Sequence, residues 1–393
     1  MLQPDPNERF RLRRQQARRR RAVRRLTALA VVVIAAAALG LGFSFLNGED
    51  GGRGPERARD AAAPQPPAPS KPEPRPAPAE MRGVHVTMAL LTIPGKLDEY
   101  LGFTRYGLNT LQLDVKDENG EVAFASRYAP LARRIGSAQA YYRPRAAIRR
   151  ARAQGLYVIA RVVVFEDPLL ARARPGMAIR RPGGGVWEND AGLGWGNPYD
   201  ERVWKYNVDV AESAARAGFD EIMFDYVRFP SDGDVEAIVY PGRVNEPKGE
   251  TIARFLEYAR GRLNPLGVRV SAAVFGLSAT RPLGIGQRPS LMAPHLDAIY
   301  PMVYPSHYSS GEYGIDDPNA NPGATVTMSL RHFRRALRGT DTKLIPWLQD
   351  FTLGRTYALA DVQAQIVAAR RLRTGGFLLW NAGGLYTAAA LGT

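Results

Sequence analysis

From Met81 onward, short apolar runs rich in β-branched residues alternate with amphipathic or alanine- and arginine-rich stretches. The expected strands are 83–91, 110–115, 157–165, 221–227, 269–275, 298–303, 343–348 and 376–380. The expected helices lie near 96–106, 143–154, 200–217, 249–263, 325–338 and 359–373, with weaker candidates at 289–294 and after 381. Strands that alternate with helices pair in parallel through βαβ crossovers, and eight such units match a closed barrel. The sequence therefore predicts an α/β fold, a (β/α)8 TIM barrel over residues 81–393.

An open, doubly wound sheet is the alternative fold. No glycine-rich phosphate loop follows the first expected strand, which disfavours that alternative. Three connections, 166–199, 228–248 and 304–322, are long, and each follows the carboxyl end of an expected strand. Long loops in compact domains are usually functional, and barrel active sites lie at this end of the strands.

The N-terminal segment has the composition of a membrane anchor. Residues 26–46 form an uncharged apolar run, and a bilayer span needs about 20 residues. Ten arginines in the basic segment 1–25 favour a cytoplasmic N-terminus, so we expect a single-pass anchor with the barrel outside the cell membrane. A cleaved signal peptide with secretion of the domain is the alternative. Repeated proline makes residues 47–80 a linker, because proline removes amide donors and fixes φ.

The net charge of +15 does not indicate nucleic-acid binding by the folded part. Residues 1–25 carry +8 and residues 47–80 carry −1, which leaves +8 spread over the rest of the chain. Cysteine is absent, so disulfides, thiolate metal sites and a cysteine nucleophile are excluded. With four histidines and no EF-hand spacing, we expect no metal or other cofactor.

Polar and aromatic side chains gather where the expected strands end. This mixture suits a sugar, whose hydroxyls need polar partners and whose C–H faces pack on aromatic rings. The predicted substrate-binding residues are Asp114, Lys116, Arg228, Tyr304, His307, Trp347, Gln349, Trp380 and Asn381, with Trp195 from the long third connection.

Cleavage of a glycosidic bond normally needs two carboxyl groups. Asp225, after the apolar Ile222–Phe224, is the first candidate for nucleophile or base, and we expect Arg228 to keep it ionised. The alternative is a salt bridge of these two side chains at the rim. Asp167 and Asp350 are the candidate proton donors, and Asp167 should share a strand face with Arg161 because side chains alternate.

Several motifs together resemble a bacterial family of glycosyl hydrolase domains. They are GVHVTM, LDVKDENGEVAF, ARVVVFEDPLLA, WGNPYDERVWKYNVDVA, GFDEIMFDYVRFPSDG, YPMVYPSHYSSGEYG, IPWLQDF and GFLLWNA, within residues 82–386. The resemblance implies a glycosidase-superfamily barrel, similar to amylase-like barrels with a nucleophilic Asp after strand 4, which falls on Asp225. The amylase-like acid after strand 5 has no counterpart in this sequence. Within FEDP, the resemblance favours Asp167 over Glu166.

The sequence therefore predicts a glycosidase that hydrolyses, or transglycosylates, an envelope or extracellular polysaccharide. Two alternatives belong to other classes: a membrane-tethered barrel that binds carbohydrate without catalysis, and a scaffold for membrane proteins. Asp225→Asn should abolish turnover in an enzyme and leave glycan affinity intact in a binding protein. A scaffold should instead expose a contiguous apolar patch.

Overall fold

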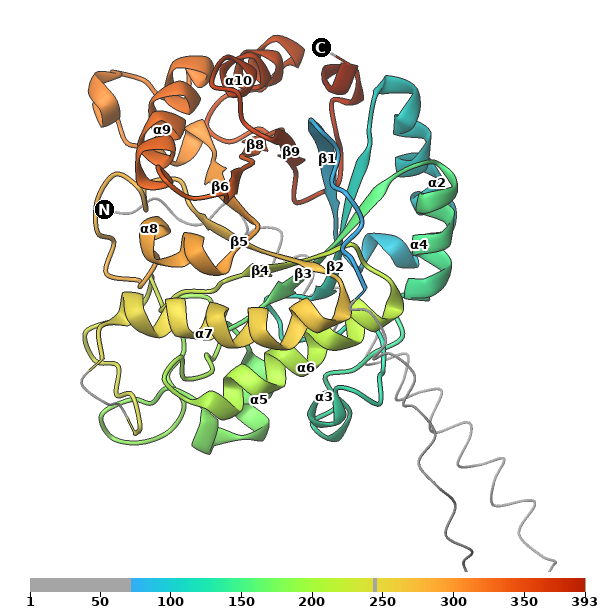
Figure 1. Ribbon diagram of the computed structural model, residues 1–393. Helices are drawn as coiled ribbons and strands as arrows, with labels where there is room; N and C mark the ends of the chain where they lie inside the picture. The colour runs from blue at the N-terminus through green and yellow to red at the C-terminus, as the bar shows by residue number, and fades with distance from the viewer. Residues whose placement is uncertain (1–71, 243–245, 393) are drawn as a thin grey trace, which may run out of the picture. The chain divides into compact units, whose positions relative to one another are not determined.

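The computed structural model describes residues 72–242 and 246–392 of the chain (Figure 1). The predicted basic segment 1–25, the anchor 26–46 and residues 47–71 of the linker lie outside the described residues. Within the two described stretches, every helix is too short or too polar to cross a bilayer.

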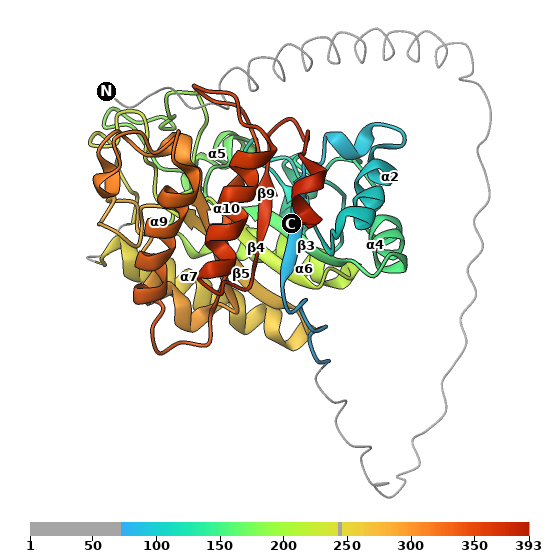
Figure 2. The same cartoon turned by 90° about the horizontal axis from the view of Figure 1, so that it is seen from above.

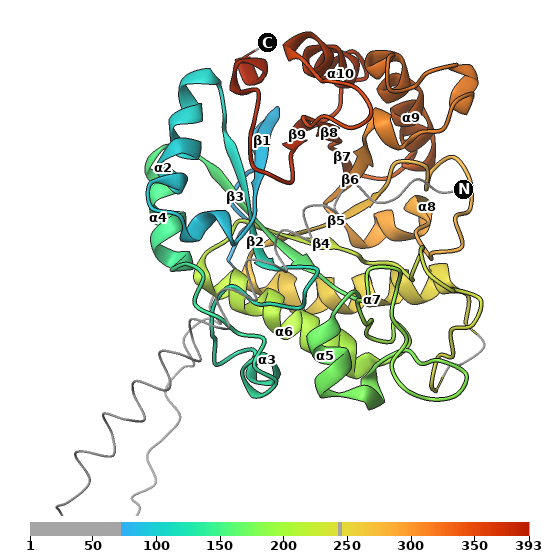
Figure 3. The ribbon, with the colours of Figure 1, turned by 180° about the vertical axis from the view of Figure 1, so that it is seen from behind.

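Parallel strands form one closed barrel, as predicted. They are β1 (Met81–Val86), β2 (Thr110–Lys116), β3 (Tyr157–Val163), β4 (Glu221–Asp225), β5 (Arg269–Phe275), β6 (Ala298–Val303), β7 (Lys343–Leu344), β8 (Trp347–Gln349) and β9 (Gly376–Trp380). The sheet runs β5-β4-β3-β2-β1-β9-β8-β6, and a pairing of β5 with β6 closes it. Both β7 and β8 pair with β6 and form the predicted seventh strand (Figure 3). Pro346 stands between them, and proline cannot donate to a strand ladder.

Helices surround the strands, and each predicted helix from 96–106 onward has a counterpart (Figures 1 and 2). They are α2 (Lys96–Leu101), α3 (Pro130–Arg134), α4 (Pro144–Ala153), α5 (Pro168–Ala173), α6 (Glu201–Ala217), α7 (Lys248–Leu263), α8 (Pro289–Met292), α9 (Pro322–Ala336) and α10 (Leu359–Arg371), with short 3₁₀ turns between them. The long helix α6 begins where Asp200 caps the Arg202 amide, and it ends at Gly218, which has a φ of 109°.

The first strand is shorter than predicted. It ends at Val86, and Leu90–Thr92 forms a 3₁₀ turn because the Leu90 amide bonds back to the Thr87 carbonyl at 3.1 Å. The strand was predicted too long because the prediction rested on apolar character, which does not show where the chain turns.

Two apolar cores hold the barrel. The outer core lies between strands and helices, and the inner core fills the barrel with side chains such as Tyr157, Met223 and Tyr300. The last part of the predicted linker packs on the amino-terminal end of the strands. There Ala77 contacts the inner core and Arg75 donates to the Leu156 carbonyl at 2.8 Å. Residues 72–80 therefore belong to the folded part, and the opposite, carboxyl end of the strands is free for a site.

Candidate active site

The guanidinium of Arg161, from β3, joins carboxylates from β2 and β4, the two strands that flank β3, at the carboxyl end of the barrel. Its NH1 donates to Asp114 Oδ1 at 2.9 Å, and its Nε and NH2 lie 2.8 and 2.7 Å from Asp225 Oδ2. The parallel register pairs Asp114 with Arg161, so both side chains point into the barrel. All three residues are at most 5% exposed, and charge-assisted hydrogen bonds of this length are strong.

His85, from β1, extends this network on the far side of Asp114. Its Nε2 lies 2.8 Å from Asp114 Oδ1. Burial by itself raises the pKa of Asp114, but His85 and Arg161 together hold that pKa below its ordinary value. Asp114 therefore remains ionised at neutral pH and is unsuited to donate a proton.

Glu118 brings a third carboxylate to the same guanidinium, and the sequence reasoning missed it. Its Oε2 lies 3.7 Å from Arg161 NH1, and its side chain is 20% exposed, against 2% and 3% for Asp114 and Asp225. Asp117 shapes this loop, because its Oδ1 accepts the amides of Asn119 and Glu121 at 3.0 Å. Burial and the neighbouring Glu118 raise the pKa of Asp117 to about 7. Glu118 stands only four residues after Asp114, in the run DVKDENG, and this proximity is the signal that could have identified it.

The backbone after Asp225 is strained, which fixes the direction of its carboxylate. Tyr226 has a φ of 49°, rare for a residue with a side chain, and its amide donates to Asp225 Oδ1 at 2.7 Å. Strain of this kind clusters at functional sites.

The predicted pairing of Asp225 with Arg228 is wrong. The Arg228 guanidinium lies 4.8 to 5.0 Å from the ring centroids of Phe275, Tyr226 and Trp195 and donates to the Phe229 carbonyl. Arg161, rather than Arg228, balances the charge of Asp225.

Aromatic rings form one wall beside the carboxylates. Tyr304 stacks on Trp380 with ring centroids 5.4 Å apart, and Phe351 meets both rings edge-on. His307, which is exposed on the 3₁₀ turn Pro305–His307, packs against Tyr304 and Phe351. Burial first, and the nearby Asp225 second, raise the pKa of Tyr304. The structure therefore brings the predicted Tyr304, His307 and Trp380 together.

Comparison with known proteins identifies the family of the barrel. A family model described as "Putative glycosyl hydrolase domain" matches residues 83–386. The chain belongs to this glycosyl hydrolase family. No curated protein matches the chain.

Two solved glycoside hydrolase structures share the barrel fold of this glycosyl hydrolase domain. The PgaB (BpsB) glycoside hydrolase domain from Bordetella bronchiseptica is 14% identical with a TM-score of 0.55, over 78% of this chain and 95% of that one. A GH20 exo-β-N-acetylglucosaminidase from Vibrio harveyi, in complex with N-acetylglucosamine, is 14% identical with a TM-score of 0.52, over 81% and 54%. A hypothetical protein from Ruminiclostridium thermocellum is 32% identical with a TM-score of 0.44, over 48% and 96%.

The predicted roles of Asp167 and Lys116 are wrong for this glycosyl hydrolase domain. Asp167 caps α5 by accepting the Leu170 amide at 2.8 Å, and its other oxygen lies 2.9 Å from Lys116 Nζ. Both side chains are fully buried between the strands of the barrel and the surrounding helices, and Lys116 also donates to Asn207 of α6. They form a structural ion pair that a substrate cannot reach.

Residues at the carboxyl ends of β8 and β9 have structural contacts in the glycosyl hydrolase domain. Both oxygens of Asp350 accept hydrogen bonds from Thr387 at 2.7 Å, and burial raises the pKa of Asp350. The buried Gln349 accepts the Ser306 amide at 3.0 Å, and Asn381 donates to the Asp350 carbonyl. These contacts hold the rim together, and the predicted proton transfer by Asp350 and sugar binding by Gln349 and Asn381 stay predictions.

The predicted stacking residues Trp195 and Trp347 are both buried, at 0% and 1% exposure. Trp195 lies under Arg228, and Trp347 lies inside the barrel with its ring stacked on His85 at 5.9 Å. Arg228 covers the Trp195 ring and His85 covers the Trp347 ring, so neither ring presents an open face on which a sugar could stack. Phe351, which the sequence reasoning missed, contributes to the aromatic wall instead.

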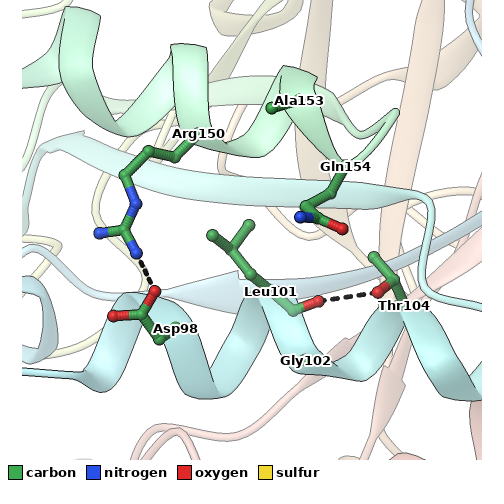
Figure 4. A pocket seen from close by; sticks show the side chains of 7 residues that line it. All are labelled: Asp98, Leu101, Gly102, Thr104, Arg150, Ala153 and Gln154. Atoms are coloured by element: carbon green, nitrogen blue, oxygen red, sulfur yellow. Dashed lines mark hydrogen bonds and ion pairs between the residues drawn. The ribbon is translucent and has the colours of Figure 1, made fainter.

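Two hollows on the outer surface lie away from the mouth of the barrel. In the one between α2 and α4, Arg150 pairs with Asp98 (Figure 4). The other lies beside α3 and α6 and has four basic residues, Arg134, Arg174, Arg202 and Lys205, on its wall. In residues 72–242 and 246–392, no three His, Asp or Glu side chains gather closely enough to hold a metal ion.

Proposed function

We propose that the mouth of this barrel hydrolyses glycosidic bonds. The observation that carries the proposal is the meeting of Asp225 and Glu118 at one guanidinium, beside an aromatic wall. Because one planar guanidinium contacts both, their oxygens lie within roughly 9 Å of each other. Pairs of carboxyl groups that cleave glycosidic bonds are about 5 to 9.5 Å apart.

Asp225 is proposed as the nucleophile or the base. Two contacts from Arg161 hold its Oδ2, and the Tyr226 amide holds its other oxygen in place. The buried His85–Asp114 pair orients Arg161. These contacts fix the position of the buried carboxylate at the end of β4.

Glu118 is proposed as the proton donor, in place of Asp167 and Asp350. It is the most exposed of the three carboxylates around Arg161, so it can approach a leaving oxygen. If water attacks, Asp225 removes its proton while Glu118 protonates the leaving oxygen. If Asp225 attacks the sugar instead, Glu118 donates a proton to the leaving oxygen and a covalent glycosyl-enzyme forms. Water then hydrolyses this intermediate while Glu118 takes a proton from the water. Attack on the intermediate by a sugar hydroxyl in place of water gives transglycosylation.

The proposed substrate is an envelope or extracellular polysaccharide. Family membership supports carbohydrate as the substrate class, and the rings of Trp380, Phe351 and His307 offer a surface for the C–H face of a sugar. The apolar run 26–46 behind ten arginines supports a membrane anchor with the barrel outside the cytoplasm. Fractionation of cells tests that location, and a shortened chain in the medium would indicate signal cleavage instead.

Release of reducing ends from a panel of envelope and extracellular polysaccharides tests the activity on the purified full-length chain. We expect Asp225→Asn and Glu118→Gln each to reduce kcat at least about a hundredfold. Asp190→Asn is the matched control, because Asp190 is an exposed carboxylate in the connection after β3. Wild-type protein that binds a glycan and never cleaves it would indicate the non-catalytic alternative, and full activity of Asp225→Asn would refute the assignment.

A further inference from the structure

Three buried polar atoms beside the carboxylates have no hydrogen-bond partner in the described structure. They are the Tyr304 hydroxyl, Trp347 Nε1 and His85 Nδ1, in side chains that are 6%, 1% and 3% exposed. Buried polar groups in folded proteins are nearly always hydrogen-bonded, because desolvation without a partner is costly. Several such atoms at one place indicate a site that a ligand completes.

The three side chains face the same part of the barrel interior. Tyr304 and Trp347 belong to the inner core, and the His85 ring stacks on Trp347. The other nitrogen of His85 contacts Asp114, and Tyr304 is close enough to Asp225 for that charge to act on its hydroxyl. The side chains that carry the unpartnered atoms therefore connect the aromatic wall, through Tyr304, with the carboxylate network, through His85.

Their chemistry restricts what can bind. The Trp347 N–H only donates, the Tyr304 hydroxyl donates and accepts, and His85 Nδ1 accepts when Nε2 donates to Asp114. A hydroxyl-bearing ligand satisfies all three, because each hydroxyl also donates and accepts. The carboxylates of Asp114 and Asp225 already engage the Arg161 guanidinium, so this cation is not free to pair with a negatively charged sugar.

We propose that Tyr304, Trp347 and His85 form a subsite for an uncharged sugar ring, held through its hydroxyls directly beside Asp225. This inference rests on the proposed function and names the class of sugar at the point of cleavage. In this subsite the buried Tyr304 hydroxyl binds the ligand, and the Tyr304 ring packs against Trp380 in the aromatic wall.

Tyr304→Phe tests the inference through stability and binding together. Removing a buried hydroxyl that has no partner should leave Tm unchanged or raise it. Tyr300→Phe is the matched control from β6, the strand that Tyr304 directly follows, because its buried hydroxyl donates to Glu221 at 2.9 Å near the base of the barrel. We expect Tyr300→Phe to lower Tm, and Tyr308→Phe, whose hydroxyl contacts Ser329 at 3.0 Å, is a second control if Tyr300→Phe does not fold.

Binding is measured on the full-length chain with an array of neutral and uronate-containing oligosaccharides. Wild-type protein should bind neutral members in preference to uronates. Tyr304→Phe should bind the best neutral member about tenfold more weakly, the effect of one lost hydrogen bond. Tyr300→Phe should bind it as the wild type does.

Each outcome decides the inference. A drop in Tm for Tyr304→Phe as large as that for Tyr300→Phe would show that the hydroxyl has a protein partner, and would overturn it. Unchanged affinity of Tyr304→Phe, or preference for uronates, would overturn it while leaving hydrolysis intact. Wild-type protein that neither binds nor cleaves any member would overturn the proposed function and the subsite together.

Discussion

Replacing Arg161 with methionine removes the cation that faces two buried carboxylates and leaves the aliphatic volume largely in place. Asp114 and Asp225 are each 2% exposed, and three contacts of 2.7 to 2.9 Å join them to the guanidinium. Removing one partner of a buried ion pair costs about 3 to 5 kcal/mol, because the remaining charge is buried without compensation. We expect a loss of unfolding free energy of this size at pH 7.

The corresponding change in Tm follows from the size of the folded part. An unfolding entropy of roughly 2.1 cal/mol/K per residue, over about 320 residues, gives about 0.7 kcal/mol per degree. Arg161→Met should therefore lower Tm by about 4 to 8 °C at pH 7. Thermal unfolding followed by circular dichroism measures the shift.

The pH dependence of this change in Tm distinguishes the loss of charge pairing from a loss of packing. In the wild type the folded pKa of Asp114 is below its unfolded value. Its contribution to stability is therefore present above the unfolded pKa of about 3.9 and is lost as pH falls through the folded pKa. In Arg161→Met, burial without the cation raises the pKa of Asp114, so acid protonates this carboxylate and relieves the penalty. The difference in Tm between the two proteins should shrink from pH 7.5 to pH 4.5.

Arg254→Met is the matched control, because Arg254 also contacts two carboxylates, those of Glu201 and Glu246, with a side chain that is 48% exposed. Exposed pairs contribute about 0 to 1 kcal/mol, so we expect a change in Tm of at most about 1.5 °C. The reasoning is refuted if Arg161→Met unfolds within 1 °C of the wild type at pH 7. It is also refuted if its deficit is the same at both pH values.

Three further substitutions separate catalytic from structural roles. Glu118→Gln should remove the limb of the kcat–pH profile that reports the proton donor, and an unchanged profile would exclude Glu118 from that role. Asp167→Asn should lower the unfolding free energy by about 3 kcal/mol, since it leaves Lys116 unpaired, while kcat of the folded fraction stays the same. The folded pKa of Asp117, about 7, lies above its unfolded value, so stability should fall as pH rises from about 4 to 7. Asp117→Asn should flatten that slope in chemical denaturation, and an equal slope in both proteins would contradict the assignment.

Much of the fold is predictable because it depends on local patterns. Apolar runs separated by amphipathic stretches indicate parallel strands and crossover helices, and the observed barrel follows that alternation from β1 to β9. The observed bounds of strands differ from the predicted ones where a single local feature ends or divides a strand. The turn from Leu90 to Thr87 ends β1 early, and Pro346 divides the seventh strand.

The candidate site is only partly predictable from the sequence. Near the end of a strand, the direction in which a side chain points depends on pairing with other strands and not only on its neighbours along the chain. The pairing of β2 with β3 shifts register between Asp114 and Lys116, which turns Lys116 toward the helices. Beyond β3, Val164 and Phe165 both pack in the outer core, so alternation no longer holds and Asp167 faces α5.

The sequence by itself determined the barrel, the end of the strands that carries the chemistry, and Asp225 as a residue of that end. Only the tertiary structure decided that Arg161 is the partner of Asp225, that Glu118 joins them, and that Asp167 does not. The physical reason is that periodicity is set by neighbouring residues along the chain. Which charges meet, in contrast, depends on register shifts and loop paths that are fixed only when separate strands pack around one axis.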